Sequence, residues 1–248
     1  MKRLYGLIGF PLGHSFSARY FADKFQQEHL PECEYRNFPL ESILELPAML
    51  ENHPELCGFN VTIPYKQEVI PYLTDLGGEA REIGAVNCVK ITPKGLFGYN
   101  TDAYGFQKSL LELIGNKRPD ALILGTGGAS KAVAYVLKKL GIPFSFVSRQ
   151  SGDNRLTYSE LTPEVMETHK LIINATPLGT FPKITDCPAI PYETLTPAHF
   201  LFDLVYNPAL TEFLRRGQEQ GAAIRNGYDM LIGQAEKAWE IWNTTSHE

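Results

Sequence analysis

The feature that most constrains the fold of this chain is a short apolar run that leads through a cluster of glycines into a helical pattern. Residues 121–124 are entirely apolar, residues 125–130 read Gly-Thr-Gly-Gly-Ala-Ser, and residues 131–140 have helical periodicity. A strand, a glycine-rich turn and a helix in this order are typical of the first unit of a dinucleotide-binding fold. Gly125 suits the tight turn, Gly127 lets a pyrophosphate approach the backbone, and the helix N-terminus supplies N–H donors.

Strand-like and helix-like segments alternate on both sides of this turn. Before it, apolar runs at residues 4–10, 58–63 and 86–91 are separated by helical patterns, and short apolar runs recur after it. Such alternation predicts an α/β protein with mostly parallel strands. A length of 248 residues suits one or two domains. Residues 229–242 have apolar side chains at helical spacing, which predicts a final helix with one buried face.

The composition excludes several classes of function. The formal charge of −5 gives no basic footprint for a nucleic acid or an anionic membrane surface. No apolar run approaches the roughly 18 residues that span a bilayer. The four cysteines are far apart and the six histidines form no HExxH-type pattern, so we expect free thiols and no metal site. These features favour a cytoplasmic location.

The residues that follow the next apolar run bear on the choice of cofactor. An NAD site usually has an acidic residue about 20 positions after the glycines, where it binds the ribose 2′-hydroxyl. This chain has Ser148, Arg149 and Gln150 there, and its nearest acidic residue is Asp153. Arg149 suits a 2′-phosphate, which favours NADP over NAD. The alternative is that Arg149 is an ordinary solvated arginine at the end of a strand.

Polar residues recur where other predicted strands end. They include the hydroxyls of Ser15 and Ser17, the segment 60–66, Asn87, and the triplet 100–102. Each of these is by itself more often a helix cap or a turn residue than a ligand. Because open α/β sheets bind ligands beyond the ends of their strands, the set as a whole predicts a binding site.

These motifs together identify a resemblance to the shikimate dehydrogenase family. The resemblance extends from Leu4 to about Trp242, which is nearly the whole chain. Eight motifs carry it in the order found in the family, at residues 14–17, 60–66, 84–87, 100–102, 125–130, 174–179, 203–208 and 227–235.

The resemblance implies a two-domain enzyme that reduces 3-dehydroshikimate to shikimate with NADPH. Residues 1–102 and 226–248 would form an α/β substrate-binding domain with a mostly parallel sheet, to which the C-terminal helix returns. Residues 103–225 would form a Rossmann-type domain. The partner would be a small molecule, with no nucleic acid and no membrane, and the protein would be a monomer or a homodimer.

The resemblance also implies a role for each site residue. Lys66 and Asp102 would be the catalytic pair next to the C3 oxygen, where hydride transfer builds negative charge and requires a proton donor. The substrate would contact Ser15, Ser17, Thr62, Asn87, Tyr206 and Gln234. The cofactor would contact Gly125, Thr126, Gly127, Gly128, Ala129, Ser148, Arg149, Thr176 and Gly227.

The sequence departs from the family pattern in the region that binds the 2′-phosphate. A second basic residue normally follows closely after the arginine, whereas Arg155 lies further along, in a segment that has the composition of a loop. Three alternatives to the family's main activity are a quinate or dual quinate/shikimate dehydrogenase, another reductase of similar architecture such as a methylene-tetrahydrofolate dehydrogenase, and a binding module without catalytic activity.

Overall fold

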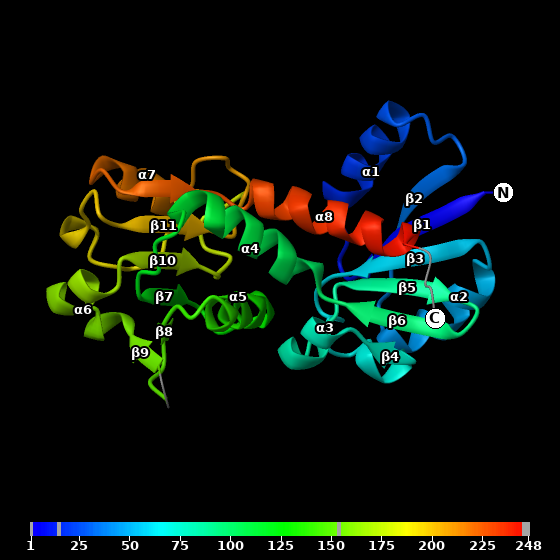
Figure 1. The fold of residues 1–248 in the computed structure, drawn as a ribbon, viewed down its shortest axis with the longest axis horizontal. Coiled ribbons are helices and arrows are strands. Elements are labelled where there is room, and N and C mark those ends of the chain that lie inside the picture. The colour runs from blue at the N-terminus through cyan, green and yellow to red at the C-terminus, as the bar shows by residue number, and fades with distance from the viewer. Residues whose placement is uncertain (1, 14–15, 153–154, 245–248) are drawn as a thin grey trace. The chain divides into compact units, whose positions relative to one another are not determined.

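The computed structural model describes residues 2–13, 16–152 and 155–244. They form two compact units, each built around one six-stranded sheet (Figure 1). The first unit comprises Met1–Thr101 and Ala235–Glu248, and the second comprises Asp102–Gln234. The predicted α/β class with two sheets of mostly parallel strands is confirmed.

The sheet of the first unit is mixed, with the strand order β2-β1-β3-β5-β6-β4. Strand β1 lies parallel to β2 and β3, whereas β5 is antiparallel to both β3 and β6. Six of the seven residues of β1 are buried, which accounts for its nearly continuous apolar run. The strands are β1 (Arg3–Gly9), β2 (Cys33–Pro39), β3 (Leu56–Val61), β4 (Asp75–Leu76), β5 (Cys88–Thr92) and β6 (Gly95–Tyr99). The helices are α1 (Phe16–Gln27), η1 (Ile43–Glu45), α2 (Leu46–Asn52), η2 (Ile70–Tyr72) and α3 (Gly78–Ile83).

The last helix, α8 (Tyr228–Asn243), begins in the second unit and ends in the first. Its C-terminal half packs on the first sheet, where the Trp242 ring stacks on Tyr5 with 4.8 Å between centroids. The Trp242 indole N–H donates to the carbonyl of Val89 at 3.0 Å. A side chain at Gly58 would place its Cβ 2.4 Å from that indole, so the glycine is required for the helix to lie so close. The predicted return of the C-terminal helix is confirmed.

The sheet of the second unit is entirely parallel, with the order β12-β11-β10-β7-β8-β9. From β7 the chain adds β8 and β9 on one side and then β10, β11 and β12 on the other. The strand order therefore reverses between β7 and β10, as in a Rossmann fold, and ligands bind at the carboxyl end of such a switch point. The strands are β7 (Ala121–Leu124), β8 (Phe144–Ser148), β9 (Arg155–Thr157), β10 (Leu171–Asn174), β11 (Phe200–Asp203) and β12 (Ala223–Arg225). The helices are α4 (Thr101–Ile114), α5 (Gly128–Lys139), η3 (Tyr158–Glu160), α6 (Pro163–Thr168), η4 (Tyr192–Thr194) and α7 (Glu212–Glu219).

One segment differs from the prediction for the second unit. Residues around Arg155 have a loop-like composition, yet Arg155–Thr157 form the edge strand β9, which pairs in parallel with residues 146–148 of β8. A three-residue edge strand buries little surface, so it leaves no apolar run in the sequence. The strand places Arg155 beside Phe146, in the middle of β8.

Candidate functional site: a dinucleotide pocket and a polar cluster

The turn after β7 has the geometry that its glycines predict. Gly125 has a φ of +103°, which only glycine adopts readily, and a Cβ there would lie 2.9 Å from Thr176 Cγ2. Gly127 is the N-cap of α5, and a Cβ at Gly127 or Gly128 would meet no atom within 4 Å. Gly127, Gly128 and Ala129 are exposed, so their backbone faces open space at the positive end of a 12-residue helix. This cradle fits the pyrophosphate of a dinucleotide.

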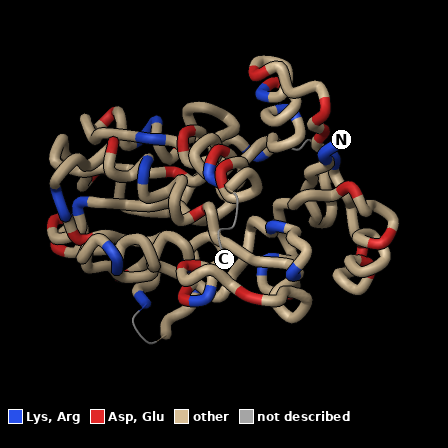
Figure 2. The backbone as a smooth tube through the Cα atoms, turned by 45° about the vertical axis from the view of Figure 1, so that its right-hand side comes forward, with Lys and Arg blue, Asp and Glu red and all other residues tan. Residues whose placement is uncertain are grey.

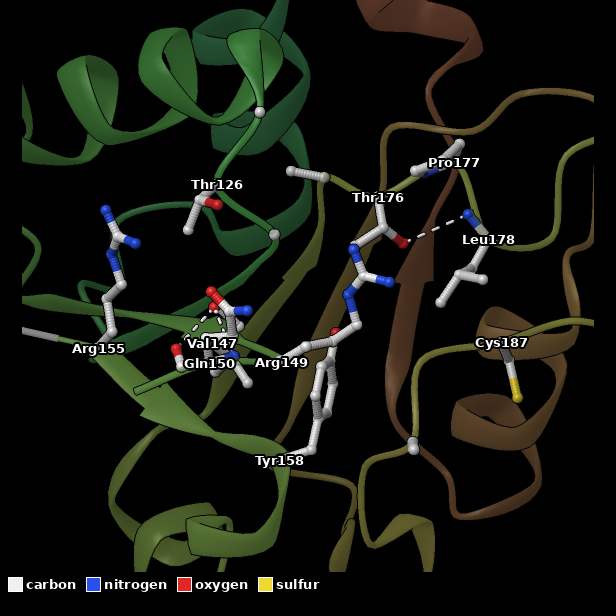
Figure 3. Close-up of a pocket in the computed structure, with 15 residues that line it drawn as sticks. Thr126, Val147, Arg149, Gln150, Arg155, Tyr158, Thr176, Pro177, Leu178 and Cys187 are labelled. Carbon is white, nitrogen blue, oxygen red and sulfur yellow. Dashed lines mark hydrogen bonds between the residues drawn. The ribbon is translucent and has the colours of Figure 1, made fainter. Parts of the chain in front are cut away.

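A pocket of about 950 Å³ opens beside this turn (Figure 3). It collects residues from the carboxyl ends of β7, β8 and β10, where the topology predicts a ligand. Three of the predicted cofactor residues do not line it: Gly128, Ala129 and Gly227. The other six do line it: Gly125, Thr126, Gly127, Ser148, Arg149 and Thr176.

Two arginines enter the pocket from neighbouring strands. Figure 3 shows Arg149 beside Tyr158 with its guanidinium toward Thr176, and Arg155 on the opposite side toward Thr126. Burial raises the pKa of Tyr158. The positive charge of Arg149 opposes that shift, because the two side chains are close enough to interact. Two guanidinium groups in one pocket suit an additional phosphate on a ligand. Arg155, whose spacing in the sequence spoke against a role as the second basic residue, is thus a candidate ligand-binding residue.

Ser148 has a local role that the sequence did not indicate. Its hydroxyl donates to the carbonyl of Gln150 at 2.8 Å and accepts from the Gln150 N–H at 3.1 Å. These bonds close a tight turn at the end of β8. Ser148 thus fixes the direction in which Arg149 leaves the strand.

The wall of the pocket opposite β8 is the turn that follows β10. Asn174 Oδ1 accepts from the backbone N–H of Thr176 at 3.0 Å and from its hydroxyl at 2.6 Å. Asn174 Nδ2 donates to the carboxylate of Asp203 at 2.9 Å. Asn174 and Asp203 are fully buried. Burial raises the pKa of Asp203 to about 6, although hydrogen bonds from Thr211, Val205 and Asn174 oppose the shift.

Gly227 lies outside the pocket, immediately before α8. Its N–H donates to the carbonyl of Val205 at 3.1 Å, and its own carbonyl accepts from Leu231. A Cβ at this position would lie 2.2 Å from the carbonyl oxygen of Leu204. Gly227 therefore allows the segment after β11 and the start of α8 to touch.

In the first unit, three of the predicted residues follow the ends of β3 and α3. Thr62 directly follows β3, where its N–H donates to the Ile8 carbonyl at 2.9 Å, and Lys66 lies in the turn beyond it. The carbonyl of Lys66 accepts from Val86 N–H at 2.7 Å, which ties that turn to the segment before β5. Asn87 is buried, and its Oδ1 accepts from the N–H of Thr101 at 2.7 Å. Thr62 and Lys66 are half-buried.

A chain of hydrogen bonds links Ser17 to this group. The Ser17 side chain hydrogen-bonds to the Tyr35 hydroxyl, which donates to Asn60 Oδ1 at 2.8 Å. Asn60 Nδ2 donates in turn to the carbonyl of Asn87 at 3.1 Å. Burial raises the pKa of Tyr35 well above its ordinary value, so the phenol keeps its proton and donates it to Asn60. Because the Tyr35 proton is directed at Asn60, the Ser17 hydroxyl donates to the Tyr35 oxygen.

The remaining predicted residues belong to the second unit or lie outside the described residues. Asp102 lies in the first turn of α4 and is half-buried. Tyr206 lies in the loop after β11 and is 37% exposed, whereas Gln234 is buried on α8. Ser15 lies outside the residues that the structure describes.

The sequence assigned no role to Asn60, Tyr35 or Asp203, and it gave Asn174 only as the first residue of a segment, 174–179, expected to form part of the cofactor site near the nicotinamide. Asn60, Asn174 and Asp203 stand inside the motifs at 60–66, 174–179 and 203–208, so their positions carried a signal, but nothing in the spacing showed which groups they bind. Tyr35 lies in β2, outside every motif, and only the contact with Asn60 reveals it.

The distribution of charge and the helix lengths bear on the predicted partners. Lys and Arg are interspersed with Asp and Glu over the described part of the chain (Figure 2). No helix among the described residues is long and apolar enough to cross a membrane. Within the same ranges, no group of three or more His, Cys, Asp or Glu residues has the arrangement of a metal site.

Comparison with known proteins identifies relatives over almost the whole chain. Residues 7–89 match the family model described as the shikimate dehydrogenase substrate binding domain. The chain is 38% identical to the shikimate dehydrogenase (NADP(+)) of Clostridium beijerinckii, with 96% of this chain and 91% of the relative covered. It is 34% identical to that of Desulforamulus reducens, with coverages of 96% and 88%.

Solved structures agree in fold. The shikimate 5-dehydrogenase of Thermus thermophilus, solved in complex with NADP(H) and shikimate, superimposes with a TM-score of 0.85 at 30% identity, covering 97% of this chain and 93% of that one. The quinate dehydrogenase of Corynebacterium glutamicum, solved in complex with NAD, gives 0.87 at 28% identity, covering 98% and 94%. The fold alone therefore does not separate shikimate from quinate enzymes. The extent of the sequence identity shows that the chain belongs to the shikimate dehydrogenase family.

Proposed function

We propose that this protein is an NADP-dependent shikimate dehydrogenase, which reduces 3-dehydroshikimate reversibly to shikimate in the pathway to chorismate and the aromatic amino acids. The observation that carries the proposal is the 38% identity to a shikimate dehydrogenase (NADP(+)) over 96% of this chain. The pocket supports the choice of cofactor, because Arg149 and Arg155 line it beside the Gly125–Gly127 turn.

The residues of the second unit would hold the dinucleotide. The exposed backbone at Gly127, Gly128 and Ala129, beside the Gly125 turn, suits the pyrophosphate. Arg149 would bind the 2′-phosphate, with Arg155 as a second cationic contact. The bound nicotinamide supplies the hydride. Ser148 would hold the Arg149 backbone through its turn with Gln150, and Thr176 would form part of the opposite wall.

The proposed substrate residues have donor and acceptor groups that match a polyhydroxylated ring acid. Ser15 and Ser17 would donate to the carboxylate, with Tyr206 nearby. The ring hydroxyls would bind Thr62, Asn87 and Gln234. Residues 1–102 and 226–248 would form the substrate-binding domain and residues 103–225 the dinucleotide domain. The match of residues 7–89 to a substrate-binding-domain model supports that assignment.

Lys66 and Asp102 would be the catalytic pair. As hydride reaches the carbonyl carbon, negative charge builds on its oxygen, and an ammonium both donates a proton and stabilises the charge. In the direction of shikimate oxidation the neutral amine of Lys66 would accept the hydroxyl proton.

Two further statements belong to the proposal. We propose a cytoplasmic location, in keeping with four unpaired cysteines. We also propose that the protein is a monomer or a homodimer, which light scattering coupled to size-exclusion chromatography would decide.

The decisive assay crosses two substrates with two cofactors. Purified protein is mixed with shikimate or quinate and with NADP or NAD, and the absorbance of the reduced nicotinamide is followed. We expect turnover with shikimate and NADP well above that of the other three combinations. Turnover mainly with quinate, or mainly with NAD, would overturn the substrate or the cofactor respectively. Folded protein that is inactive in all four combinations would favour a binding module without catalysis.

A further inference from the structure

Asp203 is a buried carboxylate for which the proposed reaction has no use. It ends β11, it has no solvent exposure, and it is not among the residues that line the dinucleotide pocket. Its Oδ2 accepts from the hydroxyl of Thr211 at 2.6 Å, and its Oδ1 accepts from the N–H of Val205 at 3.0 Å. The third bond, from Asn174 Nδ2 to Oδ1, leads toward the pocket. A buried carboxylate is costly, so a specific task accounts better for its presence than packing does.

The carboxylate determines which way the Asn174 amide points. An ionised carboxylate only accepts hydrogen bonds, so Asn174 must present its NH₂ group to Asp203. The amide oxygen is then directed at Thr176, where it accepts from both the backbone N–H and the hydroxyl. With the amide reversed, an NH₂ group would face the Thr176 N–H and an oxygen would face the carboxylate, so both bonds would be lost.

This orientation fixes the polarity of Thr176. Because its hydroxyl proton is donated to Asn174, the oxygen acts as an acceptor to its other neighbours, and the N–H of Leu178 already donates to it at 3.3 Å. Asn174 Nδ2 also lies 3.4 Å from the carbonyl of Leu178, which closes the turn from both ends. Thr176, Pro177 and Leu178 all line the pocket.

We propose that Asp203 is a positioning residue for the dinucleotide, which acts through Asn174 to hold residues 174–178 as a rigid wall of the pocket. The wall then presents the Thr176 oxygen as an acceptor for an N–H or O–H group of the ligand. The inference rests on the proposed NADP-binding function. It assigns Asn174 and Asp203 to the support of the dinucleotide pocket, although neither residue lines it.

The test measures binding separately from catalysis. Wild-type protein and variants are titrated with NADPH, whose fluorescence reports its dissociation constant, and KM for shikimate is measured at saturating NADP. Asp203→Ala removes the acceptor for Asn174 and should raise the dissociation constant for NADPH about tenfold or more, the effect of losing a charge-assisted hydrogen bond. KM for shikimate should change by no more than about twofold, since the altered wall belongs to the cofactor pocket.

Three further variants distinguish positioning from general stability. Asp203→Asn retains the Oδ1 acceptor, and its NH₂ group can donate to Thr211, so it should restore NADPH binding to within about threefold of wild type. Thr211→Val removes the bond on the far side of the carboxylate, so it should lower the thermal midpoint but leave NADPH binding within about twofold. Asn174→Ala leaves the carboxylate in place but removes the hydrogen bonds that connect Asp203 to Thr176. It should weaken NADPH binding as Asp203→Ala does, and it provides the measurement if Asp203→Ala does not fold.

The outcomes that would overturn the inference are distinct from those that would overturn the function. If wild type binds NADPH and folded Asp203→Ala or Asn174→Ala binds it equally well, the positioning role is wrong, while the proposed function is not affected. Thr211→Val that loses binding as severely as Asp203→Ala contradicts it too, because stability would then explain both. Wild type that binds no NADPH and oxidises no shikimate contradicts the proposed function, and the inference with it.

Discussion

Asp203 should make the stability of this protein depend on pH in a direction opposite to that of most carboxylates. Burial raises its pKa to about 6 from an ordinary value of 3.8. Between these two values the folded protein holds a proton at Asp203 that the unfolded chain has released. The contribution of Asp203 to stability is therefore fully present below pH 3.8 and is lost as the pH rises through 6.

The magnitude follows from the two pKa values. A shift from 3.8 to about 6 corresponds to about 3 kcal/mol in total, of which about 2 kcal/mol lies between pH 4.5 and pH 7.5. The Asp203→Asn variant cannot titrate and lacks this contribution. The free energy of unfolding of the variant minus that of wild type should thus increase by about 2 kcal/mol from pH 4.5 to pH 7.5. Tyr192, on which the Asp203 charge acts, does not interfere, because burial raises its pKa far above this range.

Urea unfolding followed by circular dichroism at the two pH values gives both free energies. Hydrogen-bond losses in Asp203→Asn that do not depend on pH cancel in the difference between the two conditions. Thr211→Val is the matched control, since it perturbs the same site but keeps the carboxyl group. The free energy of unfolding of Asp203→Asn minus that of Thr211→Val should therefore also increase by about 2 kcal/mol or more from pH 4.5 to pH 7.5. An Asp203→Asn difference that is equal at pH 4.5 and pH 7.5 would refute the argument from burial.

Three other predictions concern the proposed reaction. Lys66→Ala should lower kcat by about 10²- to 10⁴-fold, the usual contribution of an acid–base group, while shikimate binding measured by calorimetry stays close to that of wild type. Lost binding with kcat retained at saturation would remove Lys66 from that role. Arg149→Ala should lower kcat/KM for NADP about 10- to 100-fold, through loss of a charge-assisted bond to phosphate, and should change the value for NAD far less. An equal loss with both cofactors would contradict the contact with the 2′-phosphate. Ser17→Ala should raise KM for shikimate about tenfold with little change in kcat, since it removes one donor to a carboxylate. A fall confined to kcat would speak against that contact.

The sequence by itself determined the architecture of this protein. The apolar runs at β1, β7, β10 and β11 could only be buried strands, because each is short, continuous and bounded by turn residues. The glycine cluster required a tight turn into a helix, and Gly125 adopts the positive φ that such a turn needs. The sequence was sufficient for these elements, because helices and strands with a buried face place apolar residues at regular spacings along the chain.

Only the tertiary structure decided how the polar groups are used. Arg155 became a pocket residue because a three-residue edge strand, invisible in the sequence, pairs beside β8. Asn174 and Asp203 are 29 positions apart, and their contact exists because β10 and β11 are adjacent in the sheet with these two residues in register. Tyr35 and Asn60 meet from β2 and β3, strands that lie on either side of β1. A hydrogen bond acts only at a distance of about 3 Å and in a defined direction, so which donor meets which acceptor depends on strand order and register. Those are properties of the folded sheet and leave no periodic trace along the chain.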